Sequence, residues 1–299
     1  ADPPAPPPSA ELTLPPTAAD SDHHRLLQAH AAPVYDPDRR RAGVVVVLHD
    51  ITRLRQLEAV RRDFVANVSH EIKTPISAIK AAVETLLTDP EPPPGPRHNF
   101  TGIIARQADR LDAIVDDLLS LTRLEQESPD AADELKAYPV APAIAAACES
   151  CHAHAHDKSI SLQTDLPDPA PHARCVPTLL EQALVNLIDN AIKYSPEHTT
   201  VRITAQHRGE SIVLAVTDQG RGIEPEHLPR LFERFYRTDR ARSRQLGGTG
   251  LGLSIVRHIA DSLGGHATVT STLGQGSTFQ LHLTAADAPT PPRVPSPGV

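Results

Sequence analysis

The sequence has no methionine, no tryptophan and no long hydrophobic run among its 299 residues. Its longest apolar stretch, residues 42–48, is far shorter than the roughly 20 residues that a membrane-spanning helix requires. The N-terminus also lacks the pattern of a secretory signal peptide. Together with alanine at position 1, these absences favour a cytoplasmic fragment of a longer chain. Any membrane anchor would lie in segments that are absent from this sequence.

Strong positive charge is also missing. The net charge is −8 at pH 7, and a modest acidic balance argues against nucleic acid as a main partner.

Cysteine is scarce, but its placement needs comment. Cys148-Glu-Ser-Cys151-His152 matches a haem-attachment pattern. Helical spacing would also put Cys148, His152 and His156 on one face, as in a zinc site. The stretch ends an alanine-rich predicted helix (140–156), where histidines suit the helix dipole. We therefore favour a structural helix over haem or zinc.

Proline clusters at both ends of the chain. Seven prolines fall within the first sixteen residues, and the C-terminal tail is similar. We expect residues 1–22 and 287–299 to be disordered, because neither buries enough apolar surface to offset chain entropy. Between them, residues 23–50 predict two strands around a turn.

Two long helices are predicted next. From Leu54 to Ile79, apolar residues recur at helical spacing, and Asp50 is a plausible N-cap. A proline-rich break follows Thr88, and a second helix starts near Arg97. Because one αα-hairpin has too little core alone, we expect a dimeric four-helix bundle, with packing onto the C-terminal domain as the alternative.

The remaining residues mix helices and strands, with helices grouped on one side of a sheet. This order predicts an α+β fold, a two-layer sandwich. The expected elements are helices at 140–156, 178–194 and 250–263, and strands at 159–165, 201–206, 211–217, 266–271 and 277–284. Thr178-x-x-Glu181 is a capping-box pattern that would start the second of these helices.

A histidine beside a carboxylate stands in the first helix. His70 and Glu71 lie about one turn before Pro75, which should bend the helix, and Thr74 lies one turn after His70. A lone helical histidine is usually a surface or packing residue. His70 is nevertheless a candidate functional residue, because a group of motifs further along the chain resembles an ATP site.

The first part of that group is a polar face on the predicted helix at 178–194. Asn186, Asn190 and Lys193 are spaced by four and three, so they share one face. Amides facing a domain interior are costly unless they bind something. Asn190 can offer an oxygen to Mg²⁺, while Lys193 faces phosphate. The alternative interpretation is that this face is only exposed to solvent, which would explain Lys193 better than the two amides.

Two glycine-containing segments complete the group of motifs that resembles an ATP site. Asp218 ends a strand and can accept a hydrogen bond from an exocyclic amine, and Gly220 and Gly222 let backbone approach a planar ring. Alone, this motif is a common turn. A second segment opens a helix, where free N–H groups cradle phosphate: Gly248, Thr249, Gly250, Leu251, Gly252 and Leu253. An aromatic loop with Arg237 could form a lid.

In this order, the segments resemble those of bacterial two-component sensor histidine kinases. The similarity runs from about residue 33 to 283. The matching motifs are the H-box (64–76), N-box (181–195), first G-box (218–223), F-box (231–237), second G-box (248–253) and third G-box (274–279). Residues 24–52 resemble the last strands of a PAS sensor domain. One departure is Val176, where the family often has aspartate; we expect Thr178 to cap instead.

The resemblance implies a domain order. It comprises a disordered segment (1–22), a PAS remnant (23–50), a dimerisation and histidine-phosphotransfer domain (51–126), a Bergerat-type ATP-binding domain (137–286) and a disordered tail (287–299). It also implies that Tyr194, Ile223 and Thr278 join the residues above in contacting ATP.

The implied reaction transfers the γ-phosphoryl of ATP, with Mg²⁺ on Asn190, to His70. Glu71 would act as the base, and a response-regulator aspartate would take the phosphoryl. Thr74 would orient water if the homodimer also works as a phosphatase. The rival interpretations are an inactive scaffold that docks a regulator, and an ATPase of the chaperone or gyrase kind.

Overall fold

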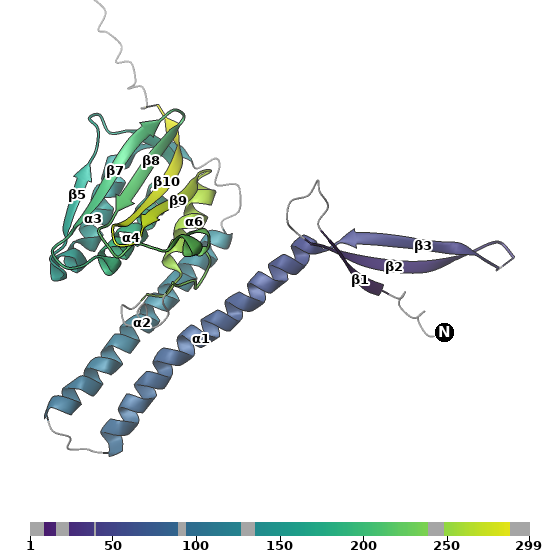
Figure 1. Ribbon diagram of the computed structural model, residues 1–299, viewed down its shortest axis with the longest axis horizontal. Coiled ribbons are helices and arrows are strands. Elements are labelled where there is room, and N and C mark those ends of the chain that lie inside the picture. Colours follow the sequence, from purple (N-terminus) through teal and green to yellow (C-terminus); the bar gives the residue numbers. More distant parts are fainter. Residues whose placement is uncertain are drawn as a thin grey trace, which may run out of the picture. The chain divides into compact units, whose positions relative to one another are not determined.

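The computed structural model describes residues 9–15, 24–38, 40–88, 94–126, 135–238 and 248–287, and Figure 1 shows its elements. Internal contacts divide the chain into two units, residues 1–70 and residues 71–299. The long helix α1 (Thr52–Thr88) runs through the boundary between them. Each unit is described by itself.

The first unit contains a three-stranded antiparallel sheet in the order β1-β2-β3. The strands β2 (Arg25–Tyr35) and β3 (Arg41–Asp50) confirm the two predicted strands. The strand β1 (Ser9–Leu14) contradicts the expected disorder at these positions. These six residues contain no proline and alternate apolar and polar side chains near their end, so they can pair with β2 although prolines flank them. The rest of residues 1–22, apart from Pro15, and the tail at 288–299 lie outside the described residues.

A side-chain cap joins the sheet to α1. Oδ1 of Asp50 accepts hydrogen bonds from the backbone N–H (3.0 Å) and the hydroxyl (2.6 Å) of Thr52. These bonds hold the pKa of Asp50 below its usual range. The Thr52 hydroxyl also accepts a bond from the N–H of Leu26 at 2.9 Å. The Asp50 side chain therefore caps the start of α1, although Ile51 rather than Asp50 occupies the position directly before the helix.

The helical hairpin consists of α1 and α2 (Pro94–Gln126). The second helix begins three residues before the predicted start, with a proline at its first position, where a missing N–H costs nothing. Along residues 71–126, Ile114 and Leu121 are buried, while Ile76, Val115 and Leu119 are about half exposed. An apolar stripe of this kind is what a partner pair of helices would cover.

The rest of the second unit is a sheet covered by helices on one face (Figure 1). Six strands follow the order β4-β6-β10-β8-β7-β5, and β9 pairs with β10. Only the β5–β7 pair is parallel among those described. The strands are β4 (Lys136–Pro139), β5 (Ser161–Asp165), β6 (His172–Cys175), β7 (Thr200–Arg208), β8 (Ser211–Thr217), β9 (His266–Thr272) and β10 (Gly276–Ala286). The helices are α3 (Val140–Asp157), α4 (Pro177–Tyr194), η2 (Pro225–Arg230) and α6 (Gly252–Ser262). This arrangement confirms the α+β two-layer sandwich.

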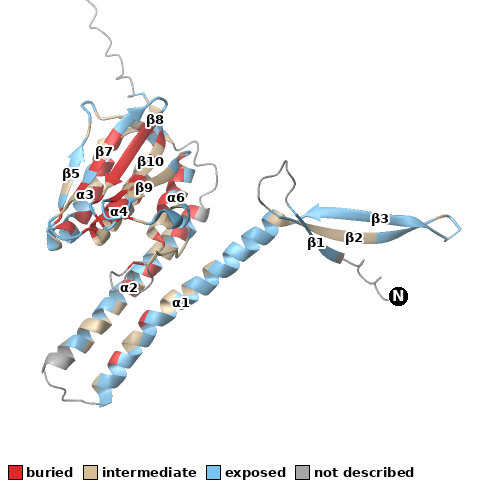
Figure 2. Ribbon diagram, in the orientation of Figure 1, coloured by how far each residue is buried: buried red, intermediate tan, exposed pale blue. Residues whose placement is uncertain are grey.

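The core lies between the sheet and its helices, where Figure 2 shows the buried residues in red. Leu184 and Ile188 of α4 and Ile212 and Leu214 of β8 have no exposed surface. Each such side chain stabilises the fold by about 1.5–3 kcal/mol relative to its exposed state. The core fixes α4 against the sheet, and the polar face of α4 then points to the site described below.

The start of α4 differs from the prediction. The helix begins at Pro177, and Val176 occupies the N-cap position with extended backbone and no side-chain cap. Thr178 is thus inside the helix, and the expected capping role is wrong. Pro177 has its φ angle already set for the first helical position and needs no partner for an N–H, so the chain passes directly from β6 into α4.

Candidate functional site

One cavity of about 240 Å³ gathers most of the predicted nucleotide-binding residues of the second unit. Its walls come from α2, α4, the loop after β8, residues 231–238, the glycine-rich start of α6 and the start of β10. The predicted residues that line it are Asn186, Asn190, Lys193, Tyr194, Asp218, Gly220, Gly222, Ile223, Arg237, Gly248, Thr249, Gly250, Gly252 and Leu253.

Two predicted residues lie beside the cavity wall rather than on it. Leu251 is fully buried, in the N-cap position of α6. Thr278 lies on β10, where its hydroxyl is 3.0 Å from that of Thr217 on β8. Both side chains therefore support the wall from behind, because the alternation of the strand and the turn into α6 direct them away from the cavity.

Asp218 is the most buried carboxylate of the cavity, with 5% of its surface exposed. Its Oδ1 accepts hydrogen bonds from the N–H groups of Gly220 (2.7 Å) and Ser277 (3.2 Å). Burial raises the pKa of this carboxyl, and the two bonds oppose that rise. Within the described residues both bonds go to Oδ1, which leaves Oδ2 for a donor inside the cavity.

Glycine is required in the loop that carries Asp218. Gly222 has φ +69°, and a Cβ there would lie 2.0 Å from the carbonyl oxygen of Thr272. A Cβ at Gly220 would lie 2.8 Å from the carbonyl oxygen of Tyr194. The loop therefore passes directly against the end of α4 and the β9–β10 hairpin.

The C-terminal end of α4 is held by a lysine that the sequence reasoning missed. Nζ of Lys158 donates hydrogen bonds to the carbonyl oxygens of Ile192, Lys193 and Ser195 at 2.8, 2.9 and 2.9 Å. Burial lowers the pKa of Lys158. These bonds satisfy carbonyls at the helix end and so fix the turn that presents Lys193 to the cavity.

Two carboxylates that were not predicted, Asp189 and Asp117, also line the cavity. Asp189 lines the cavity, and its Oδ2 lies 3.8 Å from Nζ of Lys193. Asp117 of α2 also lines it and accepts a 2.6 Å hydrogen bond from the hydroxyl of Thr249. Burial raises the pKa of Asp117. Asp117 could not be found from sequence, since one aspartate on an amphipathic helix carries no signal.

Arg237 is nearly fully buried, with 5% of its side chain exposed. Its Nη2 donates to the carbonyl oxygen of Gly248 and to Oε2 of Glu71, 3.2 Å away. Burial lowers the pKa of Arg237. Its Nε is buried and has no hydrogen-bond partner in the part of the chain that the structure describes. A buried guanidinium N–H of this kind is a ready donor to an anionic oxygen.

The predicted catalytic residues lie along α1. His70 and Thr74 are exposed, and Glu71 is partly buried. In the second unit, Oε2 of Glu71 accepts a 2.8 Å hydrogen bond from Nη2 of Arg110, in addition to its bond with Arg237. His70 and Thr74 are one helical turn apart, so they share a face of α1.

Other residues of the wall came from outside the predicted motifs or from unassigned positions in them. They are Ala113, Arg221, Leu231, Tyr236, Thr238, Ser277 and Phe279. Leu231 and Tyr236 lie in the aromatic loop, whose pattern was the available signal. Arg221, Ser277 and Phe279 hold unassigned positions in the first and third G-box segments, whereas Ala113 and Thr238 lie outside the predicted motifs and are placed by tertiary contacts.

Among the described residues, none of the cysteines belongs to a group of three potential metal ligands. All three are free, and burial raises the pKa of Cys151 to about 12 and that of Cys175 to about 11, which disfavours thiolate ligands. Within the described ranges, the ligand atoms of Cys148, His152 and His156 do not come together. The structure confirms the helix predicted at 140–156 as α3 (Val140–Asp157). In the same described ranges, every helix is too short or too polar for a membrane span.

Two family models match the chain. Residues 60–127 match the "His Kinase A (phospho-acceptor) domain", and residues 175–287 match the "Histidine kinase-, DNA gyrase B-, and HSP90-like ATPase". A sensor-like histidine kinase, SenX3 of Mycobacterium tuberculosis, is 43% identical over 264 residues, which are 87% of this chain and 62% of the relative. The chain thus spans about three fifths of the length of that relative.

Solved structures of histidine kinases are also similar to this chain. Full-length ShkA in complex with AMPPNP is 30% identical, with a TM-score of 0.53 over 77% of this chain and 47% of that one. The histidine kinase ThkA in complex with the response regulator TrrA has a TM-score of 0.60 over 94% of this chain and 79% of that one; at 20% identity it shows the fold alone. The two matched domains in this order and the identity to SenX3 show that the chain belongs to the two-component sensor histidine kinases.

Proposed function

We propose that the protein is an ATP-dependent histidine kinase that phosphorylates His70 and passes the phosphoryl group to an aspartate of a response regulator. The observation that carries this proposal is the presence, in one cavity, of a buried acceptor, Asp218, together with the cations Lys193 and Arg237. A nucleotide has a matching adenine amine and anionic phosphates. AMPPNP, an ATP analogue, is bound by the relative ShkA.

Asp218 would read the adenine ring. Its Oδ1 is committed to backbone donors, so Oδ2 would accept a hydrogen bond from the exocyclic amine of adenine. GTP presents a carbonyl oxygen at that position, and two facing acceptors repel each other. The site would thereby select ATP over GTP.

Lys193, Arg237 and the N–H groups of the glycine loop would bind the phosphates. The oxygens of Asn190 and Asp189 on the same wall fit Mg²⁺, which prefers oxygen ligands. The metal would supply neutralisation of phosphate charge, which is the main demand of phosphoryl transfer.

His70 would be the nucleophile. One unprotonated ring nitrogen attacks the γ-phosphorus, so that an N–P bond forms while the P–O bond to ADP breaks. Glu71 would accept the proton of the other ring nitrogen and act as the base. The phosphoryl group would then move to an aspartate of a receiver domain. The complex of ThkA with a response regulator supports this class of partner.

The half-exposed apolar stripe of the hairpin fits a homodimeric four-helix bundle. The strands β2 and β3, which lead through Asp50 into α1, fit the end of a PAS domain. A cytoplasmic location for these residues is part of the same proposal.

Incubation with γ-labelled ATP tests the proposed function. Label should appear on the protein, resist alkali and be lost in acid, as a phosphohistidine requires. His70→Gln should abolish labelling but retain nucleotide binding, and His154→Gln, an exposed histidine elsewhere, should label like the parent. Absence of label would favour an inactive scaffold, and release of free phosphate would favour an ATPase. Labelling of His70→Gln at the parent rate would contradict the assignment.

A further inference from the structure

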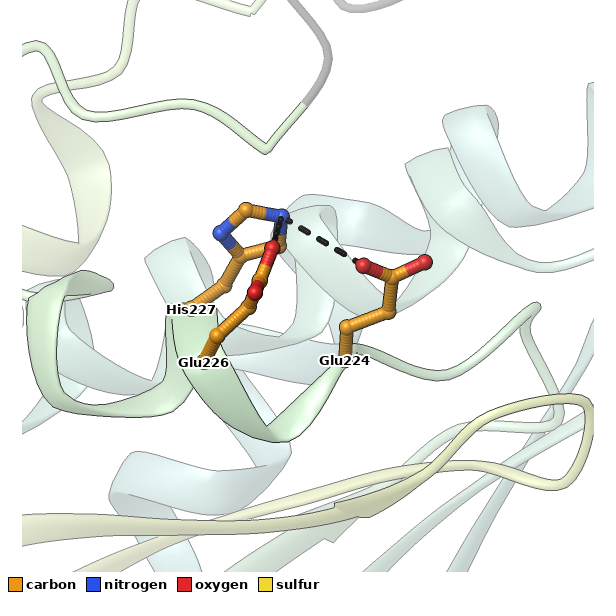
Figure 3. Close-up of side chains that lie close together, drawn as sticks. All are labelled: Glu224, Glu226 and His227. Atoms are coloured by element: carbon orange, nitrogen blue, oxygen red, sulfur yellow. Dashed lines mark ion pairs between the residues drawn. The ribbon is translucent and has the colours of Figure 1, made fainter.

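Three potential metal ligands meet at the start of the short helix η2. Nε2 of His227 lies 3.9 Å from Oε2 of Glu224 and 3.8 Å from Oε1 of Glu226 (Figure 3). The three ligand atoms all lie within 4.8 Å of one another. Among the residues that the structure describes, no other group of three His, Cys, Asp or Glu side chains meets this condition. None of the three lines the nucleotide cavity.

We propose that Glu224, Glu226 and His227 bind a divalent transition-metal ion of the Zn²⁺ class. An imidazole nitrogen favours zinc and its neighbours over Mg²⁺ and Ca²⁺, which prefer oxygen alone. Two carboxylates balance the charge of the ion. Three protein ligands leave a further coordination position for water.

The distances are those of a site that closes slightly around its ion. Zinc bonds of about 2.0–2.2 Å in tetrahedral geometry put ligand atoms roughly 3.4 Å apart. The 3.8 and 3.9 Å separations therefore need to shrink by a few tenths of an ångström. The side chains of Glu224 and Glu226 are 56% and 75% exposed, so they can rotate, whereas that of His227 is 24% exposed and held in place.

Tyr236 orients the imidazole from the other side. Its hydroxyl lies 2.8 Å from Nδ1 of His227. Histidines that bind metals nearly always have such a partner on the second ring nitrogen. With the ion on Nε2, the ring proton is on Nδ1 and is donated to the tyrosine oxygen. Arg230 lies over the Tyr236 ring, but its charge is paired with Glu233 at 2.9 Å, so it does not oppose a cation at the cluster.

Metal binding is measured on the chelator-treated chain without nucleotide, so its outcome does not depend on kinase activity. Zn²⁺ is titrated calorimetrically in excess Mg²⁺, which fills sites for hard cations, and Co²⁺ absorption reports the geometry. We expect one Zn²⁺ per chain. Glu224→Gln, Glu226→Gln and His227→Gln should each weaken binding at least about tenfold, and Tyr236→Phe should weaken it by about tenfold through loss of the orienting bond.

Two controls separate this site from the other histidines. His152 and His156 stack on α3 with ring centroids 6.4 Å apart and are exposed, so they form the main competing pair. The double variant His152→Gln/His156→Gln should bind Zn²⁺ like the parent. Glu210→Gln, an exposed glutamate in the β7–β8 turn and outside the cluster, should also leave binding unchanged. Because both glutamates of the cluster are exposed, their variants should keep the parent melting temperature.

The proposal is overturned by any of three results: no Zn²⁺ uptake by the parent, uptake that is unchanged in Glu224→Gln, Glu226→Gln and His227→Gln, or uptake that the α3 double variant abolishes.

Discussion

Nη2 of Arg237 lies 3.2 Å from Oε2 of Glu71, and Arg110 contacts the same carboxylate oxygen at 2.8 Å. These two charged hydrogen bonds fix the position of the Glu71 carboxylate. The guanidinium of Arg237 is also the cavity donor that we assign to phosphate. Phosphate binding by Arg237 would therefore compete with one of the two hydrogen bonds that hold Glu71.

Arg237→Gln should thus lower the rate of His70 phosphorylation by about tenfold to a hundredfold, the loss of one hydrogen bond to a charged group. Single-turnover labelling at saturating ATP measures this rate. Arg202→Gln is the matched control, because Arg202 is exposed on β7 and lies outside the cavity wall. An unchanged rate in Arg237→Gln would show that this guanidinium is structural.

Asp218→Asn should separate stability from nucleotide recognition. The asparagine oxygen can still accept the bonds from Gly220 and Ser277, but its NH₂ group would face the adenine amine. ATP affinity should fall by about tenfold or more, and discrimination between ATP and GTP should be lost. Calorimetry with both nucleotides checks this result.

The difference in stability between Asp218→Asn and the parent should depend on pH. Burial raises the pKa of Asp218 in the folded state, so folding favours the protonated carboxyl, and ionisation destabilises the fold as pH rises through the folded pKa. Asp218→Asn should therefore be more stable than the parent at pH 8, and the difference should shrink as pH falls towards 4. Urea unfolding across this range measures it, and a difference that grows on acidification would refute the argument.

The polar face of α4 shows how far sequence reasoning reaches. The four- and three-residue spacing of Asn186, Asn190 and Lys193 places all three on the cavity wall, as the helical period requires. Strand and helix types were also correct where the pattern was long. The short strands β4 and β6, of four residues each, have too few residues for a period to show.

The failures have particular causes. Thr178 matched a local capping motif, but Pro177 started the helix one residue earlier. Residues 9–14 were judged by the proline content of their neighbours, although they contain none themselves. Asp117 and Lys158 act across more than thirty residues of sequence, and contacts at such separations leave no local pattern.

Lys158→Met should loosen the end of α4. The variant retains an apolar stem but loses the three hydrogen bonds to the carbonyls of Ile192, Lys193 and Ser195. We expect a loss of about 2 kcal/mol in the free energy of unfolding and a raised KM for ATP with little change in kcat, because Lys193 is no longer held. Lys158→Arg should retain part of the parent's free energy of unfolding and have a KM for ATP between those of the parent and Lys158→Met. Lys80→Met removes an exposed helical ion pair and should change stability by less than about 0.5 kcal/mol.

Thr74 should separate the kinase and phosphatase activities. It lies one helical turn after His70 on the same exposed face of α1, and a hydroxyl can both donate to and accept from a water molecule. That water would attack the aspartyl phosphate of a regulator docked over His70. Autophosphorylation requires no such water, because the attacking nitrogen belongs to the protein.

Thr74→Ala should therefore keep the labelling of His70 but slow the dephosphorylation of the regulator, whereas Thr74→Arg should impair both by crowding the face. Thr74→Ser, which retains the hydroxyl, should dephosphorylate like the parent. The measurement is the decay of purified phospho-regulator with each variant in the presence of ADP. Decay with Thr74→Ala as fast as with the parent would show that the water, if one takes part, is oriented by another residue.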